Sequence, residues 1–407
     1  MFTAPNQMEP LLIGDSRPAY LEIIGLASDL VESSSRLEGL VSKESAEEIS
    51  RLVAGMNCYY SNLIEGANTK PLDIENALRE DAGNADSANL RGLAVAHIAA
   101  WQWARSHQVA GVRLSSFAQR IRRVFYEHLS ESDGGGIVPG EIRKSDVVVG
   151  KHVAPSHEAL ERFLSRFDDA YGKSLANASM GGISRLNAIV ASMIAHHRFV
   201  WIHPFPDGNG RVARILLDSM LSACGLNESG LWSMSRGFAK TSQQYKSFLA
   251  MADQPRQGDL DGRGNLSERS LGELVKYEIR TAIDQSEFMG RMFSLENLAA
   301  RARGYFHRVR TDLHTGSANL YVHALSAGSF ERMKAGALTG LSERAARDVL
   351  GALVQEGFLV SDGPKGRVRA GFPMVAVGSL FPDLYPAGEV DQFLENKETS
   401  SRKFRMR

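Results

Sequence analysis

The segment HPFPDGNGRVAR, residues 203–214, decides how the rest of the sequence is interpreted. It follows an apolar stretch ending in FVWI and continues as ILLDSML, so we expect a tight turn between two helices. Gly208 and Gly210 flank Asn209 and let the backbone of this turn approach a ligand closely. The first turn of the second helix has free N–H groups and the positive end of the helix dipole. The segment therefore predicts an anion site, with phosphate as its natural occupant.

Four polar side chains of this segment suit chemistry on a polyphosphate. Arg211 and Arg214 are three residues apart, so both should face one side of the helix start, where two guanidinium groups can hold phosphates. Asp207 is the carboxylate beside them and the candidate Mg²⁺ ligand. His203 is the candidate general base, because histidine accepts a proton near neutral pH. Direct transfer from a nucleotide to an acceptor hydroxyl fits this set better than a covalent intermediate or a turn with unrelated charges.

The composition of the whole chain excludes several classes of protein. Of the 407 residues 43% are hydrophobic, which is enough for a folded core. Lysine and arginine number 47, and aspartate and glutamate also number 47, so the formal net charge is zero. This argues against binding of nucleic acid or membrane through the net charge of the whole molecule. Cys58 and Cys224 are too few for a disulfide framework or a cysteine-only zinc site, and we expect both in the core. Residues 1–20 lack the basic and apolar regions of an export signal, so we expect a cytoplasmic protein without a lipid anchor or membrane segment.

Most of the chain has the apolar spacing of helices. This spacing predicts helices over 19–55, 87–129, 156–173 and 183–201. The exception begins with a loop at Asp133-Gly134-Gly135-Gly136 and continues as IRKSDVVVGKHVAP, residues 142–155, where three consecutive valines before Gly150 favour a short hairpin. Residues 253–267 are rich in Gly, Asp and Pro and are expected to form a loop, but not a calcium loop, because Arg263 and Ser270 stand where oxygen-rich ligands are needed.

A change of composition near residue 310 indicates another unit. Residues 335–373 have the pattern of two helices followed by a two-stranded hairpin, with Ser342 as the N-cap of the second helix. This pattern is typical of a winged helix, a fold that often binds DNA with its second helix. Basic side chains that would suit DNA phosphates are Arg344, Arg347, Lys365, Arg367 and Arg369. Dimerisation or docking of a partner is the alternative use of such a unit.

The segment 203–214 resembles the signature of Fic-domain proteins, HPFx(D/E)GNGRxxR, and matches it at every specified position. Most members of this family transfer AMP from ATP to a serine, threonine or tyrosine hydroxyl of another protein. The resemblance implies that His203 deprotonates the target hydroxyl and that Asp207 holds Mg²⁺. It also implies that the turn of Gly208, Asn209 and Gly210, including the Asn209 side chain, cradles the α-phosphate, and that Arg211 and Arg214 hold the β- and γ-phosphates.

Two other segments resemble further parts of the same family. The hairpin over 142–155 is similar to the family's flap, which aligns the target's backbone by strand addition, and its contacts with nucleotide and target would come from Val149, Gly150, Lys151 and His152. Ser61-Asn62-Leu63-Ile64-Glu65-Gly66 is similar to the inhibitory motif (S/T)xxxE(G/N). Ser61 and Glu65 are four residues apart and share a helix face. The resemblance implies that Glu65 pairs with Arg214 and blocks the seat of the γ-phosphate.

The resemblance also places the adenine near the stretch from Trp232 to Lys246, with Tyr245 as the candidate for stacking on the base; a core aromatic is the alternative. His196 and His197 lie on the apolar helix before the signature and are expected to be packing residues rather than ligands.

Together these features predict a mainly α protein with a Fic-type helical core, a β-hairpin flap and a C-terminal winged-helix-like domain. The expected organisation is an N-terminal helical region with the inhibitory motif at 1–87, a catalytic core at 88–252, a loop and helical extension at 253–309, a winged-helix-like domain at 310–390 and a flexible basic tail at 391–407.

The leading hypothesis for function is a protein adenylyltransferase that uses ATP and Mg²⁺, is inhibited by Glu65 and acts on a target protein bound at the flap. The alternatives are removal of AMP or transfer of another phosphate-bearing group on the same scaffold, and a DNA-binding regulator with a nucleotide-sensing core. A homodimer that buries the inhibitory helix is also compatible with the sequence.

Overall fold

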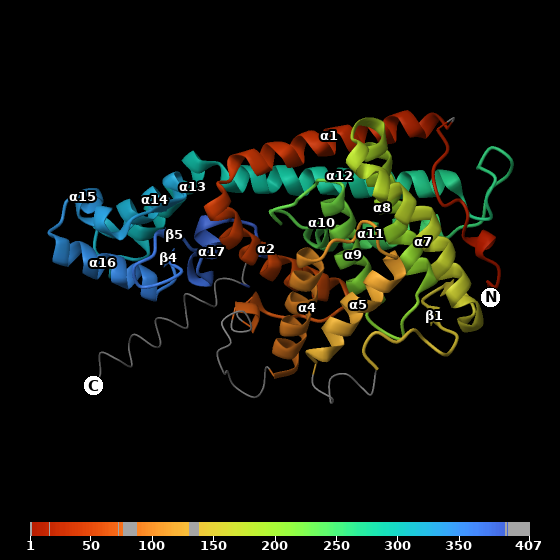
Figure 1. The fold of residues 1–407 in the computed structure, drawn as a ribbon, viewed down its shortest axis with the longest axis horizontal. Coiled ribbons are helices and arrows are strands. Elements are labelled where there is room, and N and C mark those ends of the chain that lie inside the picture. The colour runs from red at the N-terminus through yellow and green to blue at the C-terminus, as the bar shows by residue number, and fades with distance from the viewer. Residues whose placement is uncertain are drawn as a thin grey trace.

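The helix pair around the signature, α8 (Gly182–Ile202) and α9 (Asn209–Ala223), lies at the centre of the structure. The computed structural model describes residues 2–15, 17–71, 73–75, 88–129, 138–386 and 389. Helices dominate the described residues and surround this pair, as predicted (Figure 1). The loop expected at 133–136 and the tail expected at 391–407 lie outside the described residues.

Most N-terminal and core helices fall in the predicted segments, but the segments 19–55 and 87–129 are each divided between two helices. Around α8 and α9, these helices are α1 (Pro18–Leu40), α2 (Lys43–Ile64), α4 (Ala88–Ser106), α5 (Leu114–Glu127), α7 (Leu160–Ala176), α10 (Met234–Lys240) and α11 (Ser242–Ala252). Short 3₁₀ turns occur at Pro5–Met8, His157–Ala159 and Asn177–Met180.

The single helix expected over 19–55 is in fact two helices, and this prediction was wrong. Val41 adopts an extended conformation after α1, and the Ser42 side chain accepts a hydrogen bond from the Ser45 N–H at 3.2 Å. Ser42 is therefore the N-cap that starts α2. Periodicity alone did not reveal the break, because apolar spacing continues on both sides of it.

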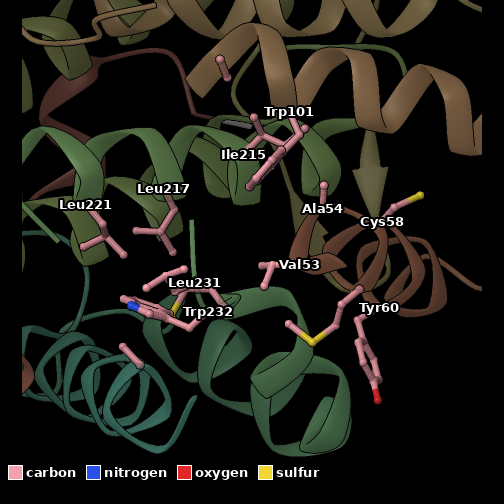
Figure 2. Close-up of a cluster of buried hydrophobic side chains, with 14 of the residues drawn as sticks. Val53, Ala54, Cys58, Tyr60, Trp101, Ile215, Leu217, Leu221, Leu231 and Trp232 are labelled. Carbon is pink, nitrogen blue, oxygen red and sulfur yellow. The ribbon is translucent and has the colours of Figure 1, made fainter. Parts of the chain in front are cut away.

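Helix α2 is buried along much of its length and carries the inhibitory motif at its C-terminal end. It packs against α10, α4 and α9. Val53 and Ala54 of α2 belong to the apolar cluster that includes Ile215 and Leu217 of α9 (Figure 2). Tyr60 lies at the edge of this cluster with its hydroxyl directed away from the other labelled side chains (Figure 2).

A long pair of helices covers one side of the core. Helix α1 packs along α12 (Glu268–Phe293), which follows the loop expected at 253–267 (Figure 1). In that loop Asp261 accepts hydrogen bonds from the backbone of Gln257 and Arg269 and from the Ser267 hydroxyl, so its carboxylate closes the loop.

The C-terminal part contains the predicted helix–turn–helix and hairpin, with additions. Its elements are α13 (Leu295–Arg308), α14 (Gly316–Ala327), β3 (Ser329–Phe330), a 3₁₀ turn at Arg332–Lys334, α15 (Ala335–Thr339), α16 (Glu343–Gln355), β4 (Leu359–Val360), β5 (Val368–Ala370) and α17 (Met374–Leu380). Ser342 caps α16 as predicted, since its side chain accepts from the Ala345 N–H. The strands form an antiparallel sheet in the order β3-β5-β4. Since α13 packs on α14 and α17, the boundary predicted at residue 310 falls inside this packed unit.

The basic residues suggested for DNA binding do not all face solvent. Arg344, Arg347, Lys365 and Arg367 are exposed. Arg369 is buried and lies between two carboxylates, Glu48 of α2 and Asp362 of the hairpin, at 3.0 and 2.7 Å. Its charge is neutralised inside the protein, so the prediction that it contacts phosphate is wrong.

Two further observations bear on predictions from composition. Cys58 and Cys224 are both buried and free, as expected. No helix among the described residues combines the length and the apolar character needed to cross a bilayer.

Candidate active site

His203 is held in an unusual backbone conformation at the end of α8. Its φ is 50°, in the left-handed region, and its N–H still donates to the Phe199 carbonyl. The Nδ1 atom lies 3.2 Å from the Val200 carbonyl oxygen. A carbonyl can only accept, so the proton of the neutral ring sits on Nδ1 and Nε2 is left as the basic nitrogen. Burial lowers the pKa of His203 below its ordinary value, so the ring is neutral at neutral pH.

Asn209 shapes the turn that follows, and its side chain is used inside the protein. Its Oδ1 accepts from the Phe205 N–H at 2.9 Å and its Nδ2 donates to the Phe205 carbonyl at 2.8 Å. The residue is 2% exposed. These two bonds use Oδ1 and one of the two Nδ2 hydrogens inside the turn, so the contact of the Asn209 side chain with the α-phosphate stays a prediction. The backbone N–H groups at the start of α9 are further candidate phosphate donors.

Asp207 points outward and is fixed on one side. Its Oδ2 accepts from the Tyr126 hydroxyl at 2.7 Å and from Arg211 Nη2 at 3.0 Å, and the side chain is 59% exposed. Burial acts to raise the pKa of Asp207, but the charge of Arg211 and the Tyr126 hydrogen bond outweigh it, so the pKa lies below its usual value. The residue is therefore an anchored, ionised carboxylate, which fits a Mg²⁺ ligand.

The surroundings of Asp207 offer few other ligands. In the described part of the chain, no three His, Cys, Asp or Glu side chains lie together in a way that could hold a metal ion. A magnesium ion at Asp207 would thus complete its shell with water and substrate phosphates, which is the usual way in which proteins bind this ion.

Glu65 lies over the start of α9 and pairs with Arg214. Its Oε1 is 2.8 Å from Arg214 Nη2, and Arg214 also donates to the Ser61 hydroxyl and carbonyl at 3.1 and 3.0 Å. A Cβ atom added to Gly210 would lie 2.2 Å from Glu65 Oε1. The glycine thus makes room for the carboxylate. The predicted pairing of Glu65 with Arg214 is present, and the Ser61 hydroxyl also accepts from Arg214.

The charge of Glu65 indicates what the site attracts. Burial acts to raise the pKa of Glu65, yet the charge and hydrogen bond of Arg214 hold it below the ordinary value. The chain thus places its own anion where the amino end of α9 and a buried arginine favour negative charge. Gly66, with φ of 83°, follows as the residue that ends α2, and the Ala67 N–H returns to the Asn62 carbonyl.

The predicted flap is a short hairpin of β1 (Val148–Val149) and β2 (His152–Val153). Gly150 and Lys151 form its turn, and Gly150 has a φ of 62°. Val148, Val149 and Val153 are exposed, so this edge is open to another extended chain. His152 instead turns inward: its Nε2 lies 2.7 Å from the Trp201 carbonyl, at the end of α8.

Arg143, which sequence reasoning missed, ties the flap to the catalytic loop. It is 3% exposed, and its Nε donates to the His203 carbonyl at 2.9 Å. Its other nitrogens donate to the carbonyls of Ser145 and Pro155, near the two ends of the flap. Its backbone N–H donates to the Pro204 carbonyl. Sequence offered only one signal for this role, an arginine at the start of the hairpin.

Tyr126 is the other functional residue that the sequence did not indicate. Its hydroxyl orients Asp207, 81 residues away in the chain. Burial raises the pKa of Tyr126 well above its usual range, so the hydroxyl keeps its proton and remains a donor to the carboxylate.

Tyr245 does not offer a free face for adenine, and the prediction that it stacks on the base is corrected. It is 3% exposed and stacks on Phe238, with ring centroids 4.3 Å apart. Its hydroxyl lies 3.2 Å from His196 Nε2, and His196 Nδ1 lies 2.7 Å from Glu278 Oε1. Tyr245 is therefore a core aromatic. His196 and His197 are buried, as expected for packing residues.

Comparisons with known proteins agree with this geometry. Residues 115–221 match the Fic/DOC family. Two curated proteins named "Protein adenylyltransferase Fic" are similar: that of Drosophila grimshawi is 30% identical over 149 residues, or 37% of this chain, and that of Drosophila willistoni is 36% identical over 86 residues, or 21%. The matched parts are 26% and 16% of those proteins, so the chain spans about a quarter of their length or less.

The fold is also similar to that of a solved structure. A Fic family protein from Desulfovibrio desulfuricans G20 superposes with a TM-score of 0.52 at 16% identity, and the match covers 88% of this chain and 98% of that one. The signature loop and the part of α9 up to residue 221 lie within the segment that matches the family. Residues 115–221 of this chain are therefore similar to the Fic/DOC family, and the likeness to the solved structure is one of fold.

Proposed function

We propose that this protein transfers AMP from ATP to a hydroxyl side chain of a target protein, and that Glu65 inhibits the reaction from within the chain. The observation that carries the proposal is the position of a basic imidazole nitrogen beside an anion-binding helix end. His203 Nε2 is left free by the Nδ1 contact to Val200, and the adjacent start of α9 attracts an anion. The names of the curated relatives support the choice of AMP as the group transferred.

The chain's own groups account for each step of such a transfer. The triphosphate lies on the N–H groups at the start of α9, with Arg211 and Arg214 offering charge to its phosphates. His203 Nε2 takes the proton of the target hydroxyl, whose oxygen bonds to the α-phosphorus while the bond from that phosphorus to the bridging oxygen of the β-phosphate breaks. The products are the AMP-modified target and pyrophosphate. Mg²⁺ bound at Asp207 would neutralise phosphate charge.

The flap gives a structural reason for a protein target. The edge of β1 and β2 is exposed and can pair with an extended segment, which would present a hydroxyl residue towards His203. Arg143 fixes this hairpin relative to the His203 carbonyl, so the acceptor and the base are positioned by one side chain.

Inhibition follows from competition for Arg214. The Glu65 carboxylate lies 2.8 Å from the Arg214 guanidinium, which would otherwise hold the γ-phosphate. ATP then binds productively only after the ion pair of Glu65 and Arg214 opens. While the pair is closed, ATP binds in an arrangement that does not lead to transfer.

Labelled ATP tests the proposal directly. The full chain is incubated with ATP labelled at the α-phosphate, and label on the protein itself or on lysate proteins is measured. Glu65→Gly should raise labelling, and adding His203→Ala to that variant should abolish it. Glu32→Gly is the control, because Glu32 lies on the neighbouring helix α1 and pairs at the surface with Arg36.

Equal labelling by the wild type, Glu65→Gly and His203→Ala proteins would refute the proposed mechanism. Release of AMP from a premodified target, dependent on Glu65 and without forward labelling, would favour removal of AMP as the function instead.

A further inference from the structure

The inhibitory helix α2 is in contact with the C-terminal unit, defined here as residues 295–386, at two separate places. Near its N-terminal end, Glu48 meets Arg369 of β5, with Arg369 Nη2 and Nε at 3.0 and 3.1 Å from Glu48 Oε1. Near its C-terminal end, the Tyr60 hydroxyl donates to the Leu384 carbonyl at 2.9 Å. In Figure 1, β5 and α17 lie beside α2.

The first contact is a buried ion pair. The side chains of Arg369 and Glu48 are 10% and 7% exposed. A buried ion pair is weak evidence for stability, but removing or reversing one partner is strongly unfavourable, so such pairs are well suited to fixing one arrangement of two elements. Arg369 lies in the central strand of its sheet, so the pair joins α2 to the most constrained strand of the C-terminal unit.

The second contact is aromatic and lies next to the inhibitory motif. Tyr385 packs edge-on against Tyr59, with centroids 5.3 Å apart, and its ring is parallel to that of Tyr60 at 6.3 Å. Tyr60 directly precedes Ser61, whose hydroxyl and carbonyl accept from Arg214. The C-terminal unit therefore touches α2 one residue away from the inhibitory contact.

The segment after α17 is also tied to the catalytic core. Arg236 of α10 donates to the Asp383 carbonyl at 2.7 Å. Between the two contacts a groove of about 320 Å³ separates α2 from the unit, lined among others by Leu52 and Gly55 of α2 and by Val360 and Met374. Helix α2 therefore contacts the C-terminal unit mainly at these two places, while its other faces pack on α10, α4 and α9.

We infer that the C-terminal unit holds α2 in its inhibitory position, so that loosening its contacts releases Arg214 from Glu65. This inference rests on the proposed function and extends it to regulation. Glu48 and Glu65 are connected by a continuous helix of rigid hydrogen-bonded turns, about 26 Å long at 1.5 Å per residue. A shift of β5 or of the segment at 381–385 moves this helix relative to α9, and a shift of about an ångström is enough to lengthen the 2.8 Å pair of Glu65 and Arg214 beyond hydrogen-bond distance.

Charge reversal on β5 tests the inference in the full chain. Arg369→Glu places a third carboxylate between Glu48 and Asp362 at this contact and should raise labelling by α-labelled ATP about 5- to 150-fold, the ordinary range of coupling between sites. Adding Glu48→Arg restores the pair with its charges exchanged and should restore low labelling. Arg367→Gln is the matched control, because Arg367 neighbours β5 but bonds Ser329 and Glu331 within its own unit.

Tyr60→Phe provides an independent variant that keeps the shape of the side chain. It removes the hydroxyl, and with it the hydrogen bond to Leu384 and the interaction with Arg236, and should also raise labelling, even if Arg369→Glu fails to fold. In a Glu65→Gly background neither change should add further labelling, because the inhibitory contact is already absent. If these substitutions raised activity by a route unrelated to inhibition, they would raise labelling above the level of Glu65→Gly alone.

The outcomes separate this inference from the proposed function. If Glu65→Gly does not label, the proposed function itself fails. If Glu65→Gly labels strongly while Tyr60→Phe and a folded Arg369→Glu stay at the wild-type level, the C-terminal unit does not hold the inhibitory helix and the inference is overturned. Thermal unfolding of each variant identifies the folded ones.

Discussion

Replacing Glu65 by alanine should increase the affinity of the protein for ATP, because ATP would no longer compete with the carboxylate for Arg214. The residue lies at the end of α2 with φ and ψ of −84° and 2°, which alanine adopts without strain. The substitution removes the contact at 2.8 Å and leaves the two contacts from Arg214 to Ser61 in place. Arg214 therefore keeps its position and gains a free donor.

The size of the effect follows from the geometry of the pair. A hydrogen bond to a charged group contributes about 1.5–3 kcal/mol. The Arg214 side chain is buried but Glu65 is 35% exposed, so solvent screening favours the lower part of that range, about 1.5–2 kcal/mol. Because about 1.4 kcal/mol corresponds to a factor of ten, ATP should bind about 10- to 30-fold more tightly.

Calorimetry in a His203→Ala background measures this affinity without turnover. Glu65→Gln should give a smaller gain, since the amide can still accept from Arg214 although its charge is gone. Glu32→Ala, at an exposed ion pair on α1, should leave the affinity unchanged. Equal dissociation constants for the Glu65→Ala and parent proteins would refute the competition between Glu65 and phosphate.

Three other predictions concern the loop and the flap. Burial lowers the pKa of His203, and this base acts only when it is neutral. In the Glu65→Gly protein, activity should therefore be lost as the pH falls through a midpoint below 6.5. A midpoint above 6.5 in the pH profile would contradict the assignment of His203 as the base. Gly210→Ala places a Cβ 2.2 Å from Glu65 Oε1 and should displace that carboxylate, seen as loss of the contact to Arg214 in a crystal structure; an unmoved pair would show that the close approach is not limiting. Arg143→Lys cannot reach all three carbonyls and should lower kcat about 10- to 100-fold with ATP affinity nearly unchanged, whereas an equal loss in both would point to general unfolding.

The parts of the site that lie close together in the chain could be predicted from the sequence. The turn at 203–214 and the flap correspond to dense local motifs, whereas the pairing of Glu65 with Arg214, 149 residues apart, was implied only by the family resemblance. Gly210 belongs to the motif at 203–214, but the reason for a glycine there is visible only in the structure, where an added Cβ would collide with Glu65.

The remaining parts depend on contacts between distant segments. Arg143 and His203 are 60 residues apart, and Tyr126 and Asp207 are 81 apart, so no local pattern signals either pair. Tyr245 was misassigned because an aromatic residue at that spacing suits both base stacking and core packing, and the stacking on Phe238 decides between them. The start of α2 was missed because its N-cap, Ser42, interrupts no apolar periodicity.

The central claim is that a triphosphate settles on the amino end of α9, with its last phosphate on Arg214 and with His203 Nε2 free beside its α-phosphate. A crystal structure of the Glu65→Gly, His203→Ala protein soaked with ATP and Mg²⁺ tests this claim most directly. The account predicts phosphate density against the backbone N–H groups of residues 209–211 and a guanidinium contact from Arg214. Nucleotide bound elsewhere, or no nucleotide at saturating concentration, would contradict it.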